Sequence, residues 1–215
     1  VVGADPASVA RFAEAHRQHG TTTIVASLVS ASFDSLAHDV AVLAELTEDG
    51  VIAGTHLEGP WIASEYKGAH DEATLRDPDP IEVDTLIRMG RGTIRMVTLA
   101  PEYPHGLDAV RRFADAGAIA AIGHTNATYV QVRAAIDAGA TCSTHLFNAM
   151  RPVNHREPGP IVALTEDDRV TNELILDGVH VHPAAAAFAG RAATGRVVFV
   201  TDAMTAAAGE DGDYM

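Results

Sequence analysis

Short apolar segments and helical segments alternate along the whole chain. The apolar segments are rich in β-branched residues and are typical of buried strands; they cover residues 21–29, 51–57, 93–99, 119–123, 141–145, 173–178 and 197–201. Between them lie stretches with apolar side chains at helical spacing, at 33–48, 81–89, 107–116, 129–138, near 161 and at 183–193. A further helix, begun by Asp5-Pro6 and closed by Gly20, precedes the first strand. Apolar strands joined by helices predict an α/β fold, in which helices cover a parallel sheet.

The number of strands narrows the fold further. A closed (β/α)8 TIM barrel has eight strands and needs about 250 residues, whereas this chain has 215 residues and seven predicted strands. Because the chain begins with a helix, we expect the first strand of the barrel to lie upstream of Val1. No shift in composition and no flexible linker divides the chain, so residues 1–215 are predicted to form a single barrel domain.

The balance of charged residues limits the kinds of molecule that the protein is expected to bind. Fifteen lysine and arginine residues face 29 aspartate and glutamate residues, which gives a formal net charge of −14. This charge disfavours non-specific binding to nucleic acid or to an anionic membrane surface, and no apolar run reaches the roughly 18 residues that span a bilayer. The single cysteine, Cys142, suits a reducing compartment, so we expect a cytoplasmic protein with neither a nucleic-acid nor a membrane partner.

Chemically reactive side chains follow five of the strands at the point where each strand ends. They are Glu58, His124, His145, His180 and Asp202. In α/β barrels the active site is built from the C-terminal ends of the strands and the loops after them, so we expect these side chains at one mouth. Taken singly, each is better explained by a structural role, such as bonding to the backbone. Together, the five indicate a site.

One glutamate and two histidines form a standard three-ligand set for a catalytic divalent metal, which leaves one position for water or substrate. We therefore predict Glu58, His124 and His145 as metal ligands. Asp202 is predicted to be the catalytic group that takes a proton from water and later returns it. Zinc is the expected metal, while iron, manganese and cobalt suit the same donors. Whether one or two ions bind depends on the missing first strand.

Six sequence phrases carry a family resemblance. They are HLEGPW at 56–61, GHTNATY at 123–129, THLFNAM at 144–150, REPG at 156–159, DGVHV at 177–181 and TDA at 201–203. Together they resemble the N-acetylglucosamine-6-phosphate deacetylases of the amidohydrolase superfamily, from about Thr21 to Gly209. The resemblance implies a metal-dependent barrel enzyme, a homodimer, that hydrolyses the N-acetyl amide of N-acetylglucosamine 6-phosphate in amino-sugar metabolism. It also implies a small β domain from both termini, so the catalytic barrel domain is expected to be incomplete at both ends.

The resemblance also implies roles for individual residues. Glu58, His124 and His145 match the metal ligands, and Asp202 matches the catalytic aspartate. His180 matches a histidine that binds the substrate and polarises its carbonyl group. The residues that match contacts to the sugar phosphate are His70 in a lid loop, Asn148 and Ala149 through their backbone amides, and Arg156.

Two more histidines lie near these positions. His182 forms a histidine–x–histidine pair with His180, which is conceivable as a second metal site. The resemblance asks for a single substrate-binding histidine there, so His182 is predicted to be structural. His56 lies two residues before Glu58 and is predicted to support the site or to pack beside it.

Two alternative functions are considered. A dihydroorotase-like or dipeptidase-like amidohydrolase would use the same metal ligands, but it has no need for Arg156 or for the amides after His145. A non-catalytic sugar-phosphate-binding barrel has no need for Asp202, so the presence of this aspartate argues against it. Because the chain is strongly acidic, a small phosphate must be held by local contacts and not by long-range attraction.

Overall fold

The structure is a computed structural model that describes residues 4–204 and 207; Gly209, where the resemblance ends, lies outside them. Its strands are β1 (Val25–Leu28), β2 (Gly54–Glu58), β3 (Ile94–Leu99), β4 (Ile119–Ile122), β5 (Ala140–Ser143), β6 (Thr171–Ile175) and β7 (Val197–Val200). The helices are α1 (Pro6–Gln18), α2 (Phe33–Glu48), α3 (Pro80–Met89), α4 (Gly106–Asp115), α5 (Tyr129–Asp137), α6 (Gly159–Glu166) and α7 (Pro183–Ala192), with short 3₁₀ turns at Ser64–Tyr66 and Glu72–Thr74. The alternation of strands and helices predicted from the sequence is confirmed.

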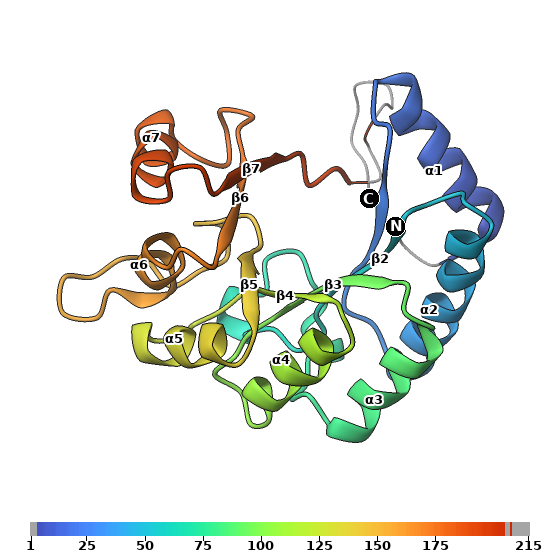
Figure 1. The fold of residues 1–215 in the computed structure, drawn as a ribbon, viewed down its shortest axis with the longest axis horizontal. Helices are drawn as coiled ribbons and strands as arrows, with labels where there is room; N and C mark the ends of the chain where they lie inside the picture. Colours follow the sequence, from blue (N-terminus) through green and yellow to red (C-terminus); the bar gives the residue numbers. More distant parts are fainter. Residues whose placement is uncertain (1–3, 205–206, 208–215) are drawn as a thin grey trace.

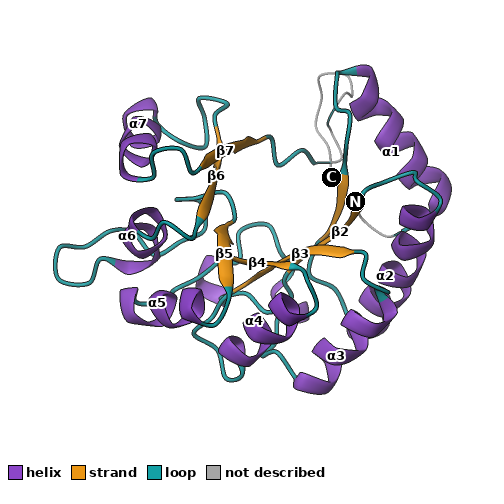
Figure 2. Cartoon of the chain, in the orientation of Figure 1, coloured by secondary structure: helices purple, strands orange, loops and turns teal. Residues whose placement is uncertain are grey.

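The strands form one parallel sheet in the order β1 to β7. The sheet curls into a half-barrel with the helices on its outer side (Figure 1). Figure 2 shows the same arrangement, with an inner arc of strands and an outer arc of helices. Among the described residues β1 and β7 do not pair with each other, so the arc stays open. Because all strands run in one direction, their C-terminal ends share one rim.

Local sequence signals start the helices where they are observed. The Asp5 carboxylate accepts a hydrogen bond from the Ser8 N–H and Pro6 occupies the first turn of α1, as predicted. At the start of α5, Thr128 and Gln131 form a reciprocal capping box. These caps satisfy N–H groups that a helix leaves without an internal partner, and so they favour the observed starts of α1 and α5.

Alternation along β2 separates the core from the site. Leu57 faces outward into the apolar core between sheet and helices, where Trp61 packs against Phe113 with ring centroids 5.6 Å apart. His56 and Glu58 lie on the opposite, inner face, because side chains two residues apart in a strand share a face. Burying such large apolar side chains contributes about 1.5–3 kcal/mol each, which anchors the strand and therefore the polar side chains on its other face.

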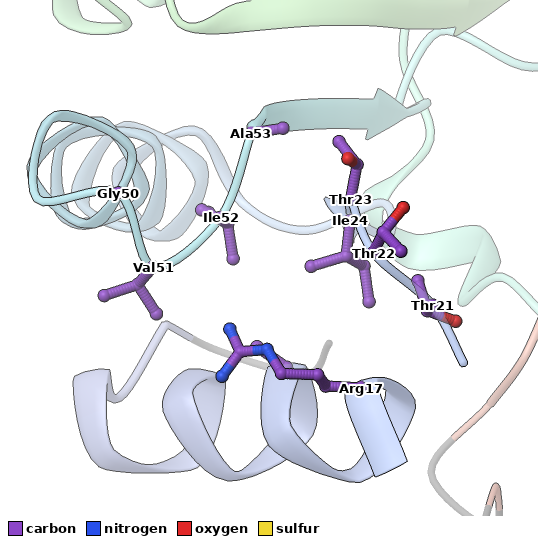
Figure 3. Close-up of a pocket in the computed structure, with 10 residues that line it drawn as sticks. Arg17, Thr21, Thr22, Thr23, Ile24, Gly50, Val51, Ile52 and Ala53 are labelled. Carbon is purple, nitrogen blue, oxygen red and sulfur yellow. The ribbon is translucent and has the colours of Figure 1, made fainter. Parts of the chain in front are cut away.

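A cavity of about 180 Å³ lies at the N-terminal ends of β1 and β2, and Figure 3 shows the residues that line it. Glu58 is the last residue of β2, so it lies at the opposite end of that strand. It is lined by Arg17 of α1 and by residues 21–24 and 50–53. The sequence predicted strands over these two segments, but the strands begin only at Val25 and Gly54. The segments border the cavity and are joined there by a hydrogen bond of 2.8 Å from the Ala53 N–H to the carbonyl oxygen of residue 24.

No helix within the described ranges has both the length and the apolar character that a membrane crossing requires.

An ion cluster on the outer side joins α5 to the turn before β6. The buried Asp167 carboxylate accepts hydrogen bonds from Arg133 at 2.6 Å and from Arg169 at 2.7 and 2.9 Å. The hydrogen bonds from Arg169 hold the pKa of Asp167 well below its usual value, despite the opposing effect of burial. The charged form of Asp167 therefore stabilises the folded state.

We expect Asp167→Asn to lower the free energy of unfolding at pH 7 by about 2 kcal/mol, because the charged acceptor of these bonds is lost. Since the folded-state pKa is depressed, the contribution is present above about pH 4 and is lost as the pH falls further. Urea unfolding at pH 7 and at pH 3 measures this, and the wild-type advantage should shrink at the lower pH. The control is Asp168→Asn at the neighbouring, 98% exposed carboxylate. Equal destabilisation by both variants would contradict the prediction.

Candidate active site

Glu58, His124 and His145 come together at the C-terminal rim of the sheet. Glu58 is the last residue of β2, His124 follows β4 and His145 follows β5. The Glu58 Oε1 atom lies 3.1 Å from His124 Nε2 and 3.2 Å from His145 Nε2, and the two Nε2 atoms are 3.0 Å apart. All three side chains are buried, with at most 7% of each residue exposed. Three side chains distant in sequence thus point at one small volume.

These donor atoms fit a divalent metal ion. Ligands of a four-coordinate zinc ion at about 2.0–2.1 Å lie about 3.3 Å from one another, close to the separations found here. The chemistry of the donors agrees, because His124 Nδ1 lies 2.8 Å from the Tyr66 carbonyl oxygen and can only donate to it. The other nitrogen of a neutral His124 ring then presents a lone pair toward Glu58 and His145.

The segment after β2 packs directly on His124. Besides the contact to Tyr66, the Ala63 N–H donates to the His124 carbonyl oxygen at 2.8 Å. Gly68 has a φ of +58°, and a Cβ atom there would lie 3.4 Å from His124 Cε1. The segment therefore holds both the backbone and the ring of His124.

The ionisable side chains of the cluster shift one another's pKa values. Burial raises the pKa of the Glu58 carboxyl, but the adjacent His124 and His145 rings together outweigh burial and hold this pKa well below its usual value. Burial lowers the pKa of His145, yet the net shift is upward because Glu58 and Asp202 favour the protonated ring. Glu58 is therefore anionic, which is the state that a carboxylate ligand requires, whereas His145 must give up its proton before its ring nitrogen can bind a cation.

Three of the five strand-end residues have an unusual backbone conformation. The φ angles are +48° at His124, +31° at His145 and +52° at Asp202. Residues other than glycine seldom adopt positive φ, and the conformation costs about 1–3 kcal/mol. Each of the three lies two residues after the last residue of its strand, so the turn redirects the chain at the rim.

His56 lies one layer below the cluster. Its Nδ1 atom is 2.9 Å from Ser27 Oγ, and its Nε2 atom is 2.8 Å from Thr98 Oγ1. Thr98 Oγ1 is in turn 2.6 Å from Thr144 Oγ1, next to His145. Burial lowers the pKa of His56. With both ring nitrogens engaged, His56 supports the strands beneath the cluster, in agreement with its predicted role.

Asp202 and His180 lie on the same rim but outside the buried cluster. Asp202 is exposed and follows β7 by two residues. It is close enough for its charge to raise the pKa of His145. His180 is half-exposed, and its Nδ1 atom lies 2.6 Å from Asp177 Oδ2. Hydrogen bonds from the His180 and Val179 N–H groups lower the pKa of Asp177 to about 2. His182 caps α7 by accepting from the Ala184 N–H at 3.1 Å, which is a structural role.

His70 is buried against the cluster. Its ring meets that of His124 edge-on with centroids 4.8 Å apart, and its Nδ1 atom lies 2.8 Å from Ser30 Oγ. Burial, followed by the charge of His124, lowers the pKa of His70 to about 4. His70 is therefore neutral near pH 7 and is held in place by Ser30.

Only some of the groups predicted to contact the phosphate have a hydrogen-bond donor that is not already used. The Asn148 N–H already donates to the His145 carbonyl oxygen at 3.0 Å. Ala149 has a φ of +50°, and its N–H makes no hydrogen bond to another described residue. Arg156 is exposed, and its guanidinium group forms no ion pair or hydrogen bond within the described residues. Ala149 and Arg156 thus have free donors, whereas Asn148 must break a bond before its N–H can bind a ligand.

Two carboxylates near the cluster were not predicted from the sequence. Glu173 of β6 accepts from the His145 N–H at 3.4 Å, and burial raises the pKa of its carboxyl group. Glu102 lies just after β3 and bonds to the residues that follow His124. Its position was a usable signal, because an acidic side chain three residues beyond a strand end lies at the same rim as the predicted site.

The contact between the 63–68 segment and His124 leads to a prediction. We expect Gly68→Ala to weaken metal binding by about tenfold, because alanine is strained at a φ of +58° and would shift the segment whose Tyr66 carbonyl oxygen orients the His124 ring, and such orienting groups typically contribute 10–100-fold to metal affinity. Zinc affinity measured by competition with a chelator checks this. The control is Gly92→Ala, where φ is +78° but no atom lies within 4 Å of the added Cβ. An equal change in zinc affinity for both variants would show that general backbone strain, and not contact with His124, is responsible.

Comparison with known proteins places this geometry in a family. The model of the amidohydrolase family matches residues 6–207. The chain is 43% identical over 163 residues to N-acetylgalactosamine-6-phosphate deacetylase of Escherichia coli O157:H7, covering 76% of this chain and 43% of that protein. It is 38% identical over 199 residues to N-acetylglucosamine-6-phosphate deacetylase of Vibrio furnissii, covering 91% and 50%. The chain thus spans about half the length of the curated relatives it matches.

Solved structures agree with these matches. The crystal structure of N-acetyl-D-glucosamine-6-phosphate deacetylase from Mycobacterium smegmatis superimposes with a TM-score of 0.96 at 52% identity, covering 98% of this chain and 56% of that chain. A mutant of that enzyme in complex with N-acetyl-D-glucosamine-6-phosphate superimposes equally well, with a TM-score of 0.96 at 51% identity, covering 99% and 56%. With the curved parallel sheet, the clustered glutamate and histidines, and a family match over nearly its whole length, the chain belongs to the amidohydrolase family.

Proposed function

We propose that the complete protein hydrolyses the N-acetyl amide of N-acetyl-D-glucosamine 6-phosphate, giving glucosamine 6-phosphate and acetate. The observation that carries this proposal is the convergence of Glu58, His124 and His145, with Asp202 on the same rim. The names of the similar curated proteins support the substrate class. In this proposal residues 1–215 are the catalytic barrel domain.

Glu58, His124 and His145 would hold one divalent ion. Zinc is proposed, and iron, manganese or cobalt would suit the same donors. A second ion would need donors beyond these three side chains. When bound, such an ion supplies Lewis acidity, which polarises a carbonyl group and makes water more acidic.

Asp202 is proposed to move the proton. As the oxygen of water bonds to the acetyl carbonyl carbon, the Asp202 carboxylate accepts the proton that water loses. When the C–N bond then breaks, Asp202 returns that proton to the sugar nitrogen, so that the amine and acetate leave and the carboxylate is restored. When both ring nitrogens carry protons, His180 would donate Nδ1–H to Asp177 and Nε2–H to the carbonyl oxygen, which would stabilise that oxygen.

The phosphate is proposed to bind where free donors lie. Arg156 offers a guanidinium fork and Ala149 a free N–H, while the Asn148 N–H and His70 complete the set in this proposal.

The expected result for Arg156→Ala is a rise in KM for the sugar phosphate that lowers kcat/KM by about 10–100-fold, which corresponds to a charged hydrogen bond of about 1.5–3 kcal/mol. Activity toward unphosphorylated N-acetylglucosamine should not change. The control is Arg191→Ala on the exposed side of α7. Equal loss on both substrates would rule out a phosphate contact.

A second substrate is supported by a specific observation. One of the similar curated proteins is named for N-acetylgalactosamine 6-phosphate and not for its glucose epimer. Acetate release should therefore be measured with both 6-phosphates and with unphosphorylated N-acetylglucosamine, and the metal content determined on the same sample. Sugar-phosphate binding without acetate release would instead favour a non-catalytic barrel. Equal rates with and without phosphate would favour another class of amidohydrolase.

A cytoplasmic homodimer is proposed for the complete protein. The single buried Cys142 suits a reducing compartment, which supports the location. Light scattering of the purified protein tests the oligomeric state, and a mass equal to one subunit would exclude the dimer.

A further inference from the structure

Glu102 is a half-buried carboxylate that lacks a cationic partner among the described residues. It lies three residues beyond the end of β3. Its Oε2 atom accepts a hydrogen bond from Thr125 Oγ1 at 2.6 Å, and its Oε1 atom accepts one from the Asn126 N–H at 2.6 Å. Burial of the carboxylate raises its pKa. Removing a charge from water is costly, and here two short hydrogen bonds offset that cost.

Thr125 joins two loops of the site. It directly follows His124 and is completely buried. Its N–H donates to the Ala149 carbonyl oxygen at 3.1 Å, and its own carbonyl oxygen accepts from the Arg151 N–H at 3.0 Å. These bonds form an isolated parallel bridge between Thr125 and Met150. The loop after β4 is thereby tied to the loop after β5.

Both loops carry candidate site groups next to the residues that Glu102 holds. His124 immediately precedes Thr125 and has a strained φ of +48°. The Ala149 carbonyl oxygen accepts the bond from the Thr125 N–H, and the Ala149 N–H has no hydrogen-bond partner among the described residues. The Glu102 carboxylate accepts hydrogen bonds from Thr125 and Asn126, and it therefore restrains the backbone that carries the His124 side chain. Because Thr125 is bonded to Ala149, the carboxylate restrains Ala149 as well.

We propose that Glu102 is a positioning residue, which holds the loops after β4 and β5 together and so sets the geometry of both the metal cluster and the phosphate contacts. The part that concerns the phosphate rests on the function proposed above. The part that concerns the metal does not, because it follows from the convergence of the three donor side chains.

The test compares three variants of the complete protein. Glu102→Ala removes both acceptors, and we expect zinc affinity to fall by about 10–100-fold, together with a higher KM for the sugar phosphate. Glu102→Gln retains the reach of the side chain, because its amide oxygen can accept from the Asn126 N–H and its NH2 can donate to Thr125 Oγ1. It should restore zinc affinity to within about threefold of wild type, a small change beside the 10–100-fold typical of a lost orienting group. Glu102→Asp keeps the charge but is too short to reach both partners, and it should resemble Glu102→Ala.

A matched control separates positioning from general stability. Asp79→Ala also removes a carboxylate that accepts two backbone N–H bonds, at the start of α3. It should lower the unfolding temperature without changing zinc affinity, because α3 loses its N-terminal cap.

The outcomes decide between the possibilities. Wild-type zinc affinity and KM in Glu102→Ala, or in Glu102→Asp if the alanine variant does not fold, would overturn the proposal. Equal losses of zinc affinity in Glu102→Gln and Glu102→Ala would also overturn the proposal, because the negative charge of Glu102, and not the reach of its side chain, would then matter. If the wild-type protein releases no acetate, the proposed function fails, while the zinc affinities still decide the role of Glu102.

Discussion

Replacing Asp202 by asparagine is expected to lower kcat for acetate release by about 10²- to 10⁴-fold while leaving metal binding unchanged. Asparagine has almost the same shape as aspartate, but it cannot accept the proton from water or return it to the leaving amine. Asp202 lies on the rim beyond β7 and not among the buried donors, so its loss removes proton transfer without removing a ligand.

Acetate release and zinc content measured on the same sample of the complete protein check this prediction. Asp168→Asn, at an almost fully exposed carboxylate on the outer side, is the matched control and should behave as wild type. Deacetylation by Asp202→Asn at the wild-type rate would remove Asp202 from the mechanism. Loss of zinc from the variant would instead make Asp202 a ligand.

The second large effect is expected for Glu58→Gln. Both histidines approach the same Oε1 atom of Glu58, at 3.1 and 3.2 Å, so this carboxylate is the anionic centre of the cluster. A neutral amide removes that charge while preserving the volume of the side chain. We expect zinc affinity to fall by more than about 100-fold, since loss of a group that only orients a ligand already costs 10–100-fold.

Two measurements check the Glu58 prediction. The first is zinc affinity by competition with a chelator. The second is thermal unfolding, because a ligand that binds only the folded state raises the unfolding temperature in proportion to its binding free energy. Zinc should stabilise the wild type and should not stabilise Glu58→Gln. Asp39→Asn is the control, since Asp39 is a buried carboxylate of α2 that bonds to the Ala4 N–H. Zinc stabilisation of Glu58→Gln equal to that of the wild type would contradict the ligand assignment.

Local signals predicted the elements of the fold well. The helix predicted at 33–48 is observed with the same bounds, because apolar spacing and the Ser32 cap both mark it. The helix begun by Asp5-Pro6 is also observed. The predictions at 21–29 and 51–57 were too long at their starts, where the chain borders the cavity beside α1. Composition could not reveal this, because a β-branched segment looks alike whether it pairs in a sheet or lines a cavity.

Local sequence signals predicted some features of the site and not others. Glu58, His124 and His145 were predictable because each stands at a strand end, and parallel strands bring their C-terminal ends together. The exposed setting of His180 and the internal bond of the Asn148 N–H could not be predicted, because loop conformation depends on contacts between loops.

The sequence by itself determined the alternation of strands and helices, and with it the rim on which Glu58, His124 and His145 meet. Only the tertiary structure decided how the His124 ring and the loop after it are held, through the Tyr66 carbonyl oxygen and the Glu102 carboxylate. The physical reason is range: periodicity and capping act within a few residues, whereas the hydrogen bonds that orient His124 and its loop join residues 23 to 58 positions apart.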